Sequence, residues 1–201
     1  MNSFSKYLNH QNHLRAKLYD TKEDSNLLDE IIMDDKLHLI YDKLSSVCSG
    51  IITRDKRFGL VYNKKGTDKK LNVRNLSTGI KTFVILKTLL TNDVIKKNGA
   101  LVLDEPEIHL HPEWQLVFAE IIVLLHKYFG LHILLTTHSP YFLNALEVYS
   151  VKHGVDNKCR YYLATSDGDV AKLDEVSDNL ESIYAELSRP LQDLEDERVK
   201  L

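Results

Sequence analysis

The stretch that decides the fold is ALVLDEPE, at residues 100–107. Its four apolar residues are typical of a strand buried within a parallel sheet, and they end abruptly in Asp104 and Glu105. A second short apolar run, HILLTT at residues 132–137, is followed at once by His138. A long helical pattern lies between the two runs and is joined to both by short links. This order predicts a right-handed βαβ unit and an α/β fold.

On either side of this unit, the chain alternates between helical and strand-like patterns. The expected elements are, in order, a helix from Asn26 to Val47, strands near 51–53, 58–62 and 71–74, a helix from Ser77 or Thr78 to Asn98–Gly99, a helix from Pro112 to Gly130, a helix after Pro140, strands near 161–164 and 170–173, and an acidic helix near 178–188 that breaks at Pro190. The polar turn within the first group of strands predicts a β-hairpin. Residues 1–24 are polar and weakly patterned, so we expect a marginal or frayed lead-in there.

The composition is that of an ordinary globular protein. Of 201 residues, 43% are hydrophobic and 27% are charged, which excludes collagen-like, low-complexity and mainly disordered chains. The net charge of −3 argues against an indiscriminate nucleic-acid binder. Cys48 and Cys159 stand in no metal-type spacing and predict free thiols in a reducing cytosol. No apolar run approaches the roughly 20 residues of a membrane span, so we expect a cytoplasmic protein with no membrane partner.

The polar residues that follow the two apolar runs suit nucleotide hydrolysis. The carboxyl ends of neighbouring parallel strands meet at one edge of a sheet, so we expect Asp104, Glu105 and His138 to lie together. Mg²⁺ prefers carboxylate, water and phosphate oxygens, and Asp104 can hold a hydrated ion. Glu105 points elsewhere and is free to orient and polarise a water molecule.

Three motifs in this order resemble those of ABC-type ATPases. LVLDEP at 101–106 resembles the Walker B motif, NLSTGIK at 75–81 resembles the signature motif, and LLTTHSP at 134–140 resembles the strand that carries the switch histidine. More closely, DEPEIHLHPEWQ and TTHSP look like the AAA-type ABC ATPases of phage-defence and overcoming-lysogenization-defect proteins, which are relatives of the SMC and DNA-repair ATPases. The resemblance covers residues 50–190 approximately, and it implies a P-loop NTPase core of parallel strands flanked by helices.

The resemblance implies a role for each residue at the strand ends. Asp104 would assist Mg²⁺ through a water molecule, and Glu105 would be the base or water-orienting carboxylate for attack on the γ-phosphate of ATP. His138 would contact the γ-phosphate and sense its presence. The loop from Glu107 to His111 would cross the interface of a dimer in which ATP is sandwiched.

Ser77, Thr78 and Gly79 are the signature residues implied to bind nucleotide. Ser77 and Gly79 would touch the γ-phosphate of ATP held by the opposing subunit. A helix N-terminus with a small hydroxyl residue and a glycine is independently suited to an anion. The motif departs from the family pattern, since Thr78 replaces the first glycine and Ile80 stands where Gln or Glu is usual.

The phosphate loop of the family, G-x-x-x-x-G-K-[ST], does not occur in the chain. In the family this loop lies upstream, among the first strands. We therefore expect residues 51–201 to be the C-terminal part of an ABC-type core, and residues 1–50 to be a helical lead-in or insertion. The chain would then belong to a larger or split ATPase, or be a degenerate subunit, and would pair with a second copy or with a partner ATPase segment. By itself it is expected to bind ATP weakly or not at all.

Other interpretations of these residues stay open. The chain could be a non-catalytic subunit or fragment that offers its signature face to a partner. His109, His111 and His138 could form a zinc hydrolase site, or the first two could cap or pair locally. Ser139 could be a nucleophile or the N-cap of the helix that begins at Pro140. A group of basic residues could be a solvated hairpin or could meet nucleic-acid phosphates: Lys64, Lys65, Lys69, Lys70 and Arg74.

Overall fold

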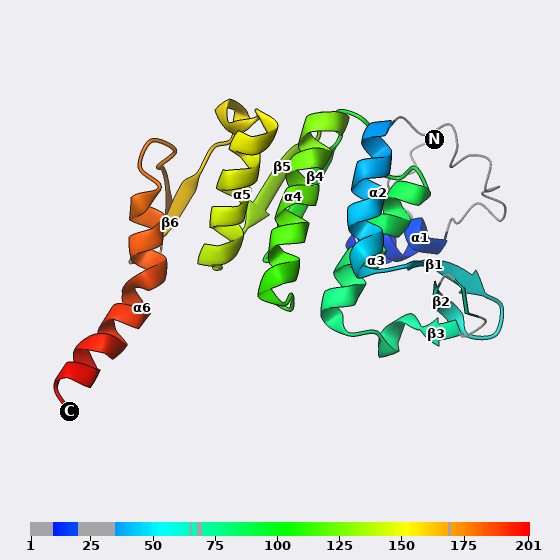
Figure 1. The fold of residues 1–201 in the computed structure, drawn as a ribbon, viewed down its shortest axis with the longest axis horizontal. Helices are drawn as coiled ribbons and strands as arrows, with labels where there is room; N and C mark the ends of the chain where they lie inside the picture. The colour runs from blue at the N-terminus through cyan, green and yellow to red at the C-terminus, as the bar shows by residue number, and fades with distance from the viewer. Residues whose placement is uncertain (1–9, 20–34, 65, 68–69, 169) are drawn as a thin grey trace.

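The computed structural model describes residues 10–19, 35–64, 66–67, 70–168 and 170–201. The elements are, in chain order, α1 (His10–Tyr19), α2 (Asp35–Val47), β1 (Gly50–Asp55), β2 (Gly59–Lys64), β3 (Lys70–Asn72), η2 (Val73–Asn75), α3 (Thr78–Thr91), β4 (Ala100–Asp104), α4 (Pro112–Phe129), β5 (His132–Thr136), α5 (Pro140–His153), η3 (Asp156–Lys158), β6 (Tyr162–Asp167), β7 (Val170–Glu175) and α6 (Glu181–Val199). Figure 1 shows them arranged along one long axis, with β1–β3 at one end and α6 at the other. The α/β class is as predicted.

The predicted strand–helix–strand unit lies at the centre of the molecule. β4 and β5 pair in parallel, with Asp104 opposite Thr136 at the end of the ladder. α4 connects the two strands, with Pro112 in its first turn and Gly130 at its end in a left-handed conformation (φ 65°). Proline suits a first turn because the N–H it lacks would have no helical partner there, and glycine takes a positive φ without a steric penalty. Both predicted ends of this helix are therefore confirmed.

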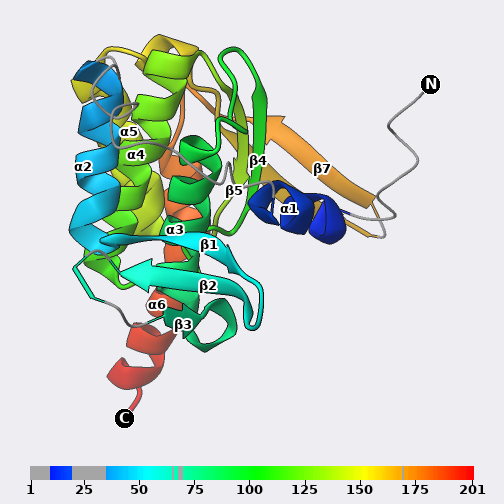
Figure 2. The ribbon, with the colours of Figure 1, turned by 90° about the vertical axis from the view of Figure 1, so that its right-hand side faces the viewer.

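The core lies between this unit and its neighbouring helices. Helices α2, α4 and α5 stand side by side on one face of the β4–β5 pair (Figure 2). Phe118 of α4 meets Phe83 of α3 edge-on, with ring centroids 5.3 Å apart, and stacks on Phe142 of α5 at 6.2 Å. All three rings are buried, and Trp114 packs against the same cluster. The long helical pattern predicted between the two apolar runs is therefore confirmed as α4, whose apolar side faces the core.

The outer face of β4 and β5 differs from the prediction. The apolar runs predict strands buried on both faces, but Val102 is 71% exposed and Leu134 is 65% exposed. Leu101 and Leu103, which point to the opposite face, pack against the core. Burial on both faces is therefore wrong for the described part of the chain, because its helices cover only one side of this sheet.

Two predicted helix ends are also wrong. α3 stops at Thr91 instead of reaching Asn98–Gly99, because Asp93 takes a left-handed φ of 53° that a helix cannot continue through. α6 continues through Pro190, where the sequence predicts a break. The proline ring removes one hydrogen bond, the one to the carbonyl of Glu186. Because no residue of α6 is buried, water can serve that carbonyl.

The N-terminal predictions are confirmed only in part. The helix predicted from Asn26 begins at Asp35 in the described residues, and 26–34 lie outside them. Of the lead-in at 1–24, the described part is α1. The predicted hairpin is present as an antiparallel sheet in the order β1, β2, β3.

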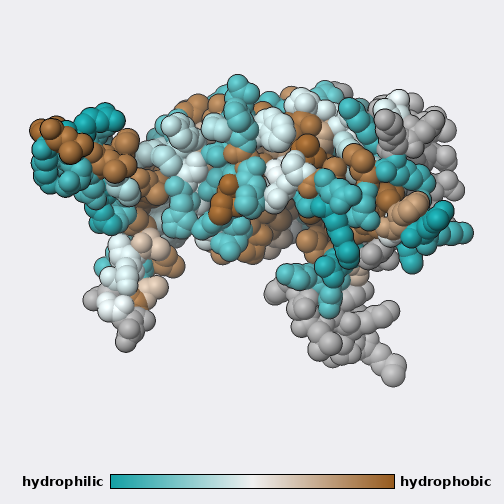
Figure 3. Space-filling model, turned by 90° about the horizontal axis from the view of Figure 1, so that it is seen from below, coloured by the Kyte–Doolittle hydropathy of each residue, from teal (hydrophilic) through white to brown (hydrophobic). Residues whose placement is uncertain are grey.

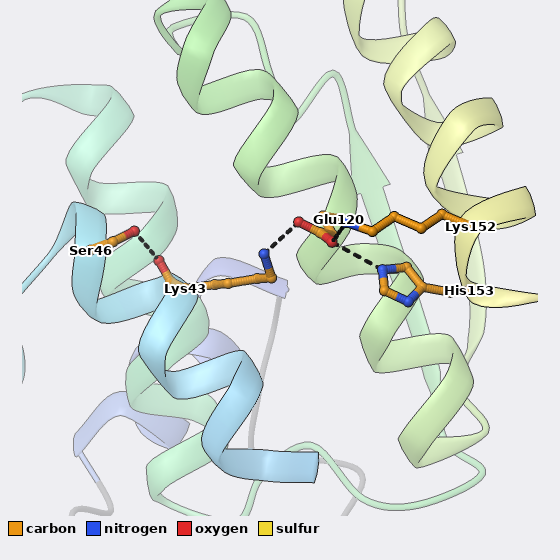
Figure 4. A network of polar contacts seen from close by, with 5 residues as sticks. All are labelled: Lys43, Ser46, Glu120, Lys152 and His153. Carbon is orange, nitrogen blue, oxygen red and sulfur yellow. Dashed lines mark hydrogen bonds and ion pairs between the residues drawn. The ribbon is translucent and has the colours of Figure 1, made fainter. Parts of the chain in front are cut away.

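A buried carboxylate on α4 ties the helix layer together (Figure 4). Glu120 is 5% exposed and pairs with Lys43 of α2 on one side. On the other side it lies 2.9 Å from Lys152 Nζ and 3.0 Å from His153 Nε2, both on α5. Burial would raise the pKa of Glu120, but hydrogen bonds from these three donors outweigh it and lower the pKa to about 2. The carboxylate is thus saturated with partners from both neighbouring helices.

α6 extends away from this layer at the C-terminal end. A hydrogen bond of 3.1 Å from the Tyr184 hydroxyl to Glu147 of α5 ties its first half to the body. Leu191 and Leu194, further along, are 64% and 67% exposed, and apolar and polar side chains lie next to one another over this end of the molecule (Figure 3).

Both cysteines are free, as predicted. Burial raises the pKa of the Cys48 thiol to about 11, against an opposing effect of Lys87, and burial also raises the pKa of Cys159. Neither thiol is therefore a ready nucleophile. None of the helices in the described ranges combines the length and apolar character that crossing a membrane requires.

Candidate functional site

The polar ends of β4 and β5 meet at one edge of the sheet, as the sequence predicts. Glu105 Oε1 lies 3.2 Å from His138 Nε2. Asp104 Oδ1 accepts a hydrogen bond of 2.6 Å from the Thr136 hydroxyl, directly across the ladder. The His138 side chain is 81% exposed and that of Glu105 is 36% exposed, so the pair lies at the surface and can be reached by a ligand.

The backbone of Glu105 is held in a strained conformation. Its φ is 42°, in the left-handed region, which a non-glycine residue adopts at an energetic penalty of about 1 kcal/mol or more. The N–H of Glu105 donates to the carbonyl of Thr136 at 3.2 Å and to its hydroxyl at 3.1 Å. β5 therefore fixes the turn that brings the Glu105 side chain toward His138.

A second carboxylate behind this pair is one that the sequence did not assign to the site. Glu107 is 4% exposed and accepts a hydrogen bond from the Thr137 hydroxyl, whereas its Oε2 atom is buried and has no hydrogen-bond partner. A cavity of about 250 Å³ lies beside it. The residues that line this cavity are Glu105, Glu107, Ile108, Gln115, His138 and Ser139. The resemblance implies that Glu107 begins a loop that crosses a dimer interface, and no local pattern in the sequence indicates that its side chain turns inward.

The signature residues lie at the start of α3, as predicted, but they face different surroundings. Ser77 is the N-cap residue, and its hydroxyl makes no capping hydrogen bond. Ser77 and Thr78 are exposed, whereas Gly79 is buried. A Cβ on Gly79 would lie 2.7 Å from the carbonyl oxygen of His109. Gly79 therefore has a role inside the chain, since it lets α3 approach the loop that follows Glu105.

The zinc alternative is not supported. His109, His111 and His138 are all described, and the described residues contain no group of three His, Cys, Asp or Glu side chains that could hold a metal ion. The ring of His111 instead accepts from the N–H of Glu113 at 3.4 Å, as a local cap. Ser139 is the N-cap of α5, because its hydroxyl accepts from the N–H of Phe142 at 3.2 Å.

The donors beside Asp104 suit a hydrated magnesium ion better than a closed metal site. One exposed carboxylate next to one hydroxyl, that of Thr136, leaves most coordination positions to water and phosphate oxygens. The basic group is described only in part, since Lys65 and Lys69 lie outside the described residues. Lys70 pairs with Asp55 at 2.9 Å, which lowers the pKa of Asp55 to about 2, together with backbone hydrogen bonds from residues 57 and 58.

Comparisons with known proteins show the family of the chain and some of its relatives. The model of the family described as "AAA domain, putative AbiEii toxin, Type IV TA system" matches residues 3–144. The "Retron Vc95 probable ATPase" of Vibrio cholerae serotype O1 biovar El Tor is 26% identical over an alignment of 148 residues, which covers 67% of this chain. The "Septu protein PtuA" of Bacillus thuringiensis is 26% identical over an alignment of 141 residues, which covers 60% of this chain. The chain spans only 27% and 35% of the lengths of these two relatives.

A solved structure shares the fold. The structure described as "SmcHead bound to the C-winged helix domain of ScpA" superposes with a TM-score of 0.51 at 15% sequence identity. The match covers 74% of this chain and 43% of that one. The predicted P-loop ATPase architecture is therefore confirmed at the level of the fold.

Proposed function

The chain belongs to this AAA-domain family, and on that premise we propose that it hydrolyses ATP with Glu105 and His138 as its reacting side chains. The observation that carries the proposal is the exposed Glu105–His138 pair at the carboxyl edge of a parallel sheet. Glu105 orients and polarises the attacking water molecule, and His138 contacts the γ-phosphate. A carboxylate that acts as a base contributes about 10²–10⁴-fold to the rate.

Asp104 is the residue that would hold magnesium, through a water molecule. A bound magnesium ion supplies charge neutralisation at the β- and γ-phosphates of ATP. The Thr136 hydroxyl donates to the Asp104 carboxylate and accepts from the backbone N–H of Glu105. One side chain of β5 therefore helps to position both acidic residues.

The nucleotide would be sandwiched between two copies of the chain, or between this chain and a partner ATPase segment. Ser77 and Thr78 of one subunit would face ATP bound to the other. Two observations support this arrangement: both residues are exposed at the N-terminus of α3, and the Ser77 hydroxyl is not used for capping. The first N–H groups of a helix and its dipole favour an anionic γ-phosphate. The role of Gly79 in this contact would be indirect, through its packing on His109.

The resemblance to phage-defence and DNA-repair ATPases favours work in defence or DNA maintenance, with nucleic acid as a candidate partner. The second candidate function is a non-catalytic subunit that offers the signature face to a partner. It is favoured by the sequence of these 201 residues, which contains no G-x-x-x-x-G-K-[ST] motif of the kind that cradles phosphates in P-loop ATPases.

The test is Glu105→Gln in the complete gene product. The amide keeps the shape but loses the carboxylate's ability to polarise water, so turnover should fall by about 10²–10⁴-fold while ATP binding is kept. Glu186→Gln, on the exposed surface of α6, is the matched control and should hydrolyse ATP as the parent does. Near-parental turnover of Glu105→Gln would assign the carboxylate a structural role. Calorimetry on the 201-residue chain alone tests the expectation that this chain binds ATP weakly or not at all. Micromolar affinity for Mg-ATP would contradict that expectation.

A further inference from the structure

We infer that Glu107 is a positioning residue, which holds the loop of His138 in place against Glu105 by way of Thr137. The structural part of this inference stands by itself. Its consequence for catalysis rests on the proposed ATPase function.

His138 depends on its neighbours for its position. Its side chain is 81% exposed, and its Nε2 atom lies 3.2 Å from Glu105 Oε1. The residues on both sides of it are tied down. The Thr137 hydroxyl donates to Glu107 and accepts from the N–H of Ser139 at 3.0 Å. The Ser139 hydroxyl in turn donates to Gln115 of α4 at 2.6 Å. A series of hydrogen bonds thus runs from the Glu107 carboxylate through Thr137 and Ser139, the two residues that flank His138, and ends at Gln115.

Glu107 is itself fixed to the turn that carries Glu105. The N–H of Ile108 donates to the carbonyl of Glu105 at 3.2 Å, and that of Leu110 donates to the carbonyl of Glu107 at 2.8 Å. This turn also presents the His109 carbonyl on which Gly79 packs. The start of α3, the Glu105 carboxylate and the His138 loop therefore meet at one short segment, and Glu107 is its link to the His138 loop.

Stability of the fold does not explain a carboxylate at this position. One of its two oxygens is buried without a partner, and such an oxygen opposes folding because it has lost its hydrogen bonds to water. An apolar side chain of similar length would remove that penalty. What it would not reproduce is the hydrogen bond to Thr137.

The test uses the His138 imidazole as a probe in the 201-residue chain. Glu107→Met removes the hydrogen bond to Thr137, and Thr137→Val removes it together with the acceptor of the Ser139 N–H. Both should shift the imidazole NMR signals of His138. Glu107→Met leaves the acceptor of the Ser139 N–H in place and should still speed amide exchange at Ser139 by roughly tenfold. Thr137→Ser keeps the hydroxyl and should restore the parental signals. The double variant should be no worse than Thr137→Val alone, because that substitution already removes the hydrogen bond between Thr137 and Glu107. Glu113→Gln, an exposed carboxylate at the start of α4, is the matched control.

Activity of the complete gene product gives a second readout. Glu107→Met and Thr137→Val should lower kcat by about 10²-fold, as misplaced catalytic groups do, with the KM for ATP within about threefold of the parent. Thr137→Ser should retain turnover. Unchanged His138 signals in both Glu107→Met and Thr137→Val would overturn the inference, whatever their activity. Shifted signals in a protein whose parent hydrolyses no ATP would instead support the link and refute the proposed ATPase.

Discussion

Two carboxylates of this molecule, Glu120 and Glu105, lie in opposite kinds of surroundings. Glu120 is buried in the helix layer and pairs with two lysines and a histidine. Glu105 lies at the sheet edge, has a single histidine beside it, and sits on a strained backbone. The carboxylate that holds the fold is saturated with partners, whereas the one proposed for chemistry is left open to a ligand. Changes at the sheet edge should therefore affect function without stability, and changes at Glu120 should do the reverse.

The largest expected effect is at the signature helix. Ser77→Arg places a long cation at the exposed start of α3, where the opposing subunit's nucleotide is proposed to bind, so ATP-dependent dimerisation and hydrolysis should be lost in the complete gene product. The melting temperature should stay near that of the parent, because Ser77 is exposed and its hydroxyl caps nothing. Light scattering with and without ATP measures the dimer. A variant that still dimerises with ATP as the parent does would refute the role of Ser77 across the interface.

Glu120→Gln should give the opposite outcome, a loss of stability. The substitution leaves Lys43, Lys152 and His153 without their anion, and we expect the free energy of unfolding at pH 7 to fall by about 2 kcal/mol. The value lies below that for a fully buried pair because the Lys152 side chain is 57% exposed and can be hydrated.

The pH dependence of this loss has a defined sign. Folding lowers the pKa of Glu120 from 4.5 to about 2, so its contribution is complete above pH 4.5 and disappears as the pH falls through about 2. Urea unfolding of the parent and of Glu120→Gln should converge over that range. Glu113→Gln, on the same helix but exposed, is the control. The difference in unfolding free energy between parent and variant should shrink from about pH 5 to about pH 2, around the two pKa values. A difference that stays constant over this range would contradict a stabilising role for the ionised Glu120 carboxylate.

The smallest effect concerns Gly79. Replacing glycine by alanine within a helix normally stabilises it by about 1 kcal/mol. Here the new Cβ would lie 2.7 Å from the His109 carbonyl oxygen, so α3 and the loop must move apart, and we expect a net loss of about 1 kcal/mol instead. Thermal unfolding measures the sign. Thr78→Ala, at the exposed neighbouring position, gives the comparison, and a rise in melting temperature for Gly79→Ala would show that the loop adapts.

Local sequence patterns predicted the centre of the fold and the part of the candidate site that lies at the ends of β4 and β5. The β4–α4–β5 unit follows from two short apolar runs, a proline and a glycine, all of which act within their own segment. Asp104, Glu105 and His138 meet because parallel strands end at the same edge. The partners of Glu107 and Glu120 come from segments about 30 residues or more away, so periodicity could not reveal them. Glu120 has one local sign, an acid within the apolar run FAEIIVLL at 118–125.

The errors have the same origin. The end of α3 depends on the left-handed conformation of Asp93. Aspartate in a sequence does not predict a positive φ as strongly as glycine does. The continuation of α6 through Pro190 depends on the exposure of that helix. The open face of β4 and β5 depends on which helices pack there, and a run of apolar residues indicates burial without saying on how many sides.

The left-handed backbone of Glu105 also bears on the history of the chain. Glycine or asparagine would adopt its φ of 42° with less strain, and a single substitution could therefore stabilise this turn at the expense of the carboxylate. In relatives that no longer catalyse a reaction, replacement of this glutamate by glycine or asparagine would relieve the strain without loss of function. We expect relatives that have lost catalytic activity to carry glycine or asparagine at this position, because only a need for the carboxylate would favour glutamate over a less strained residue at this φ.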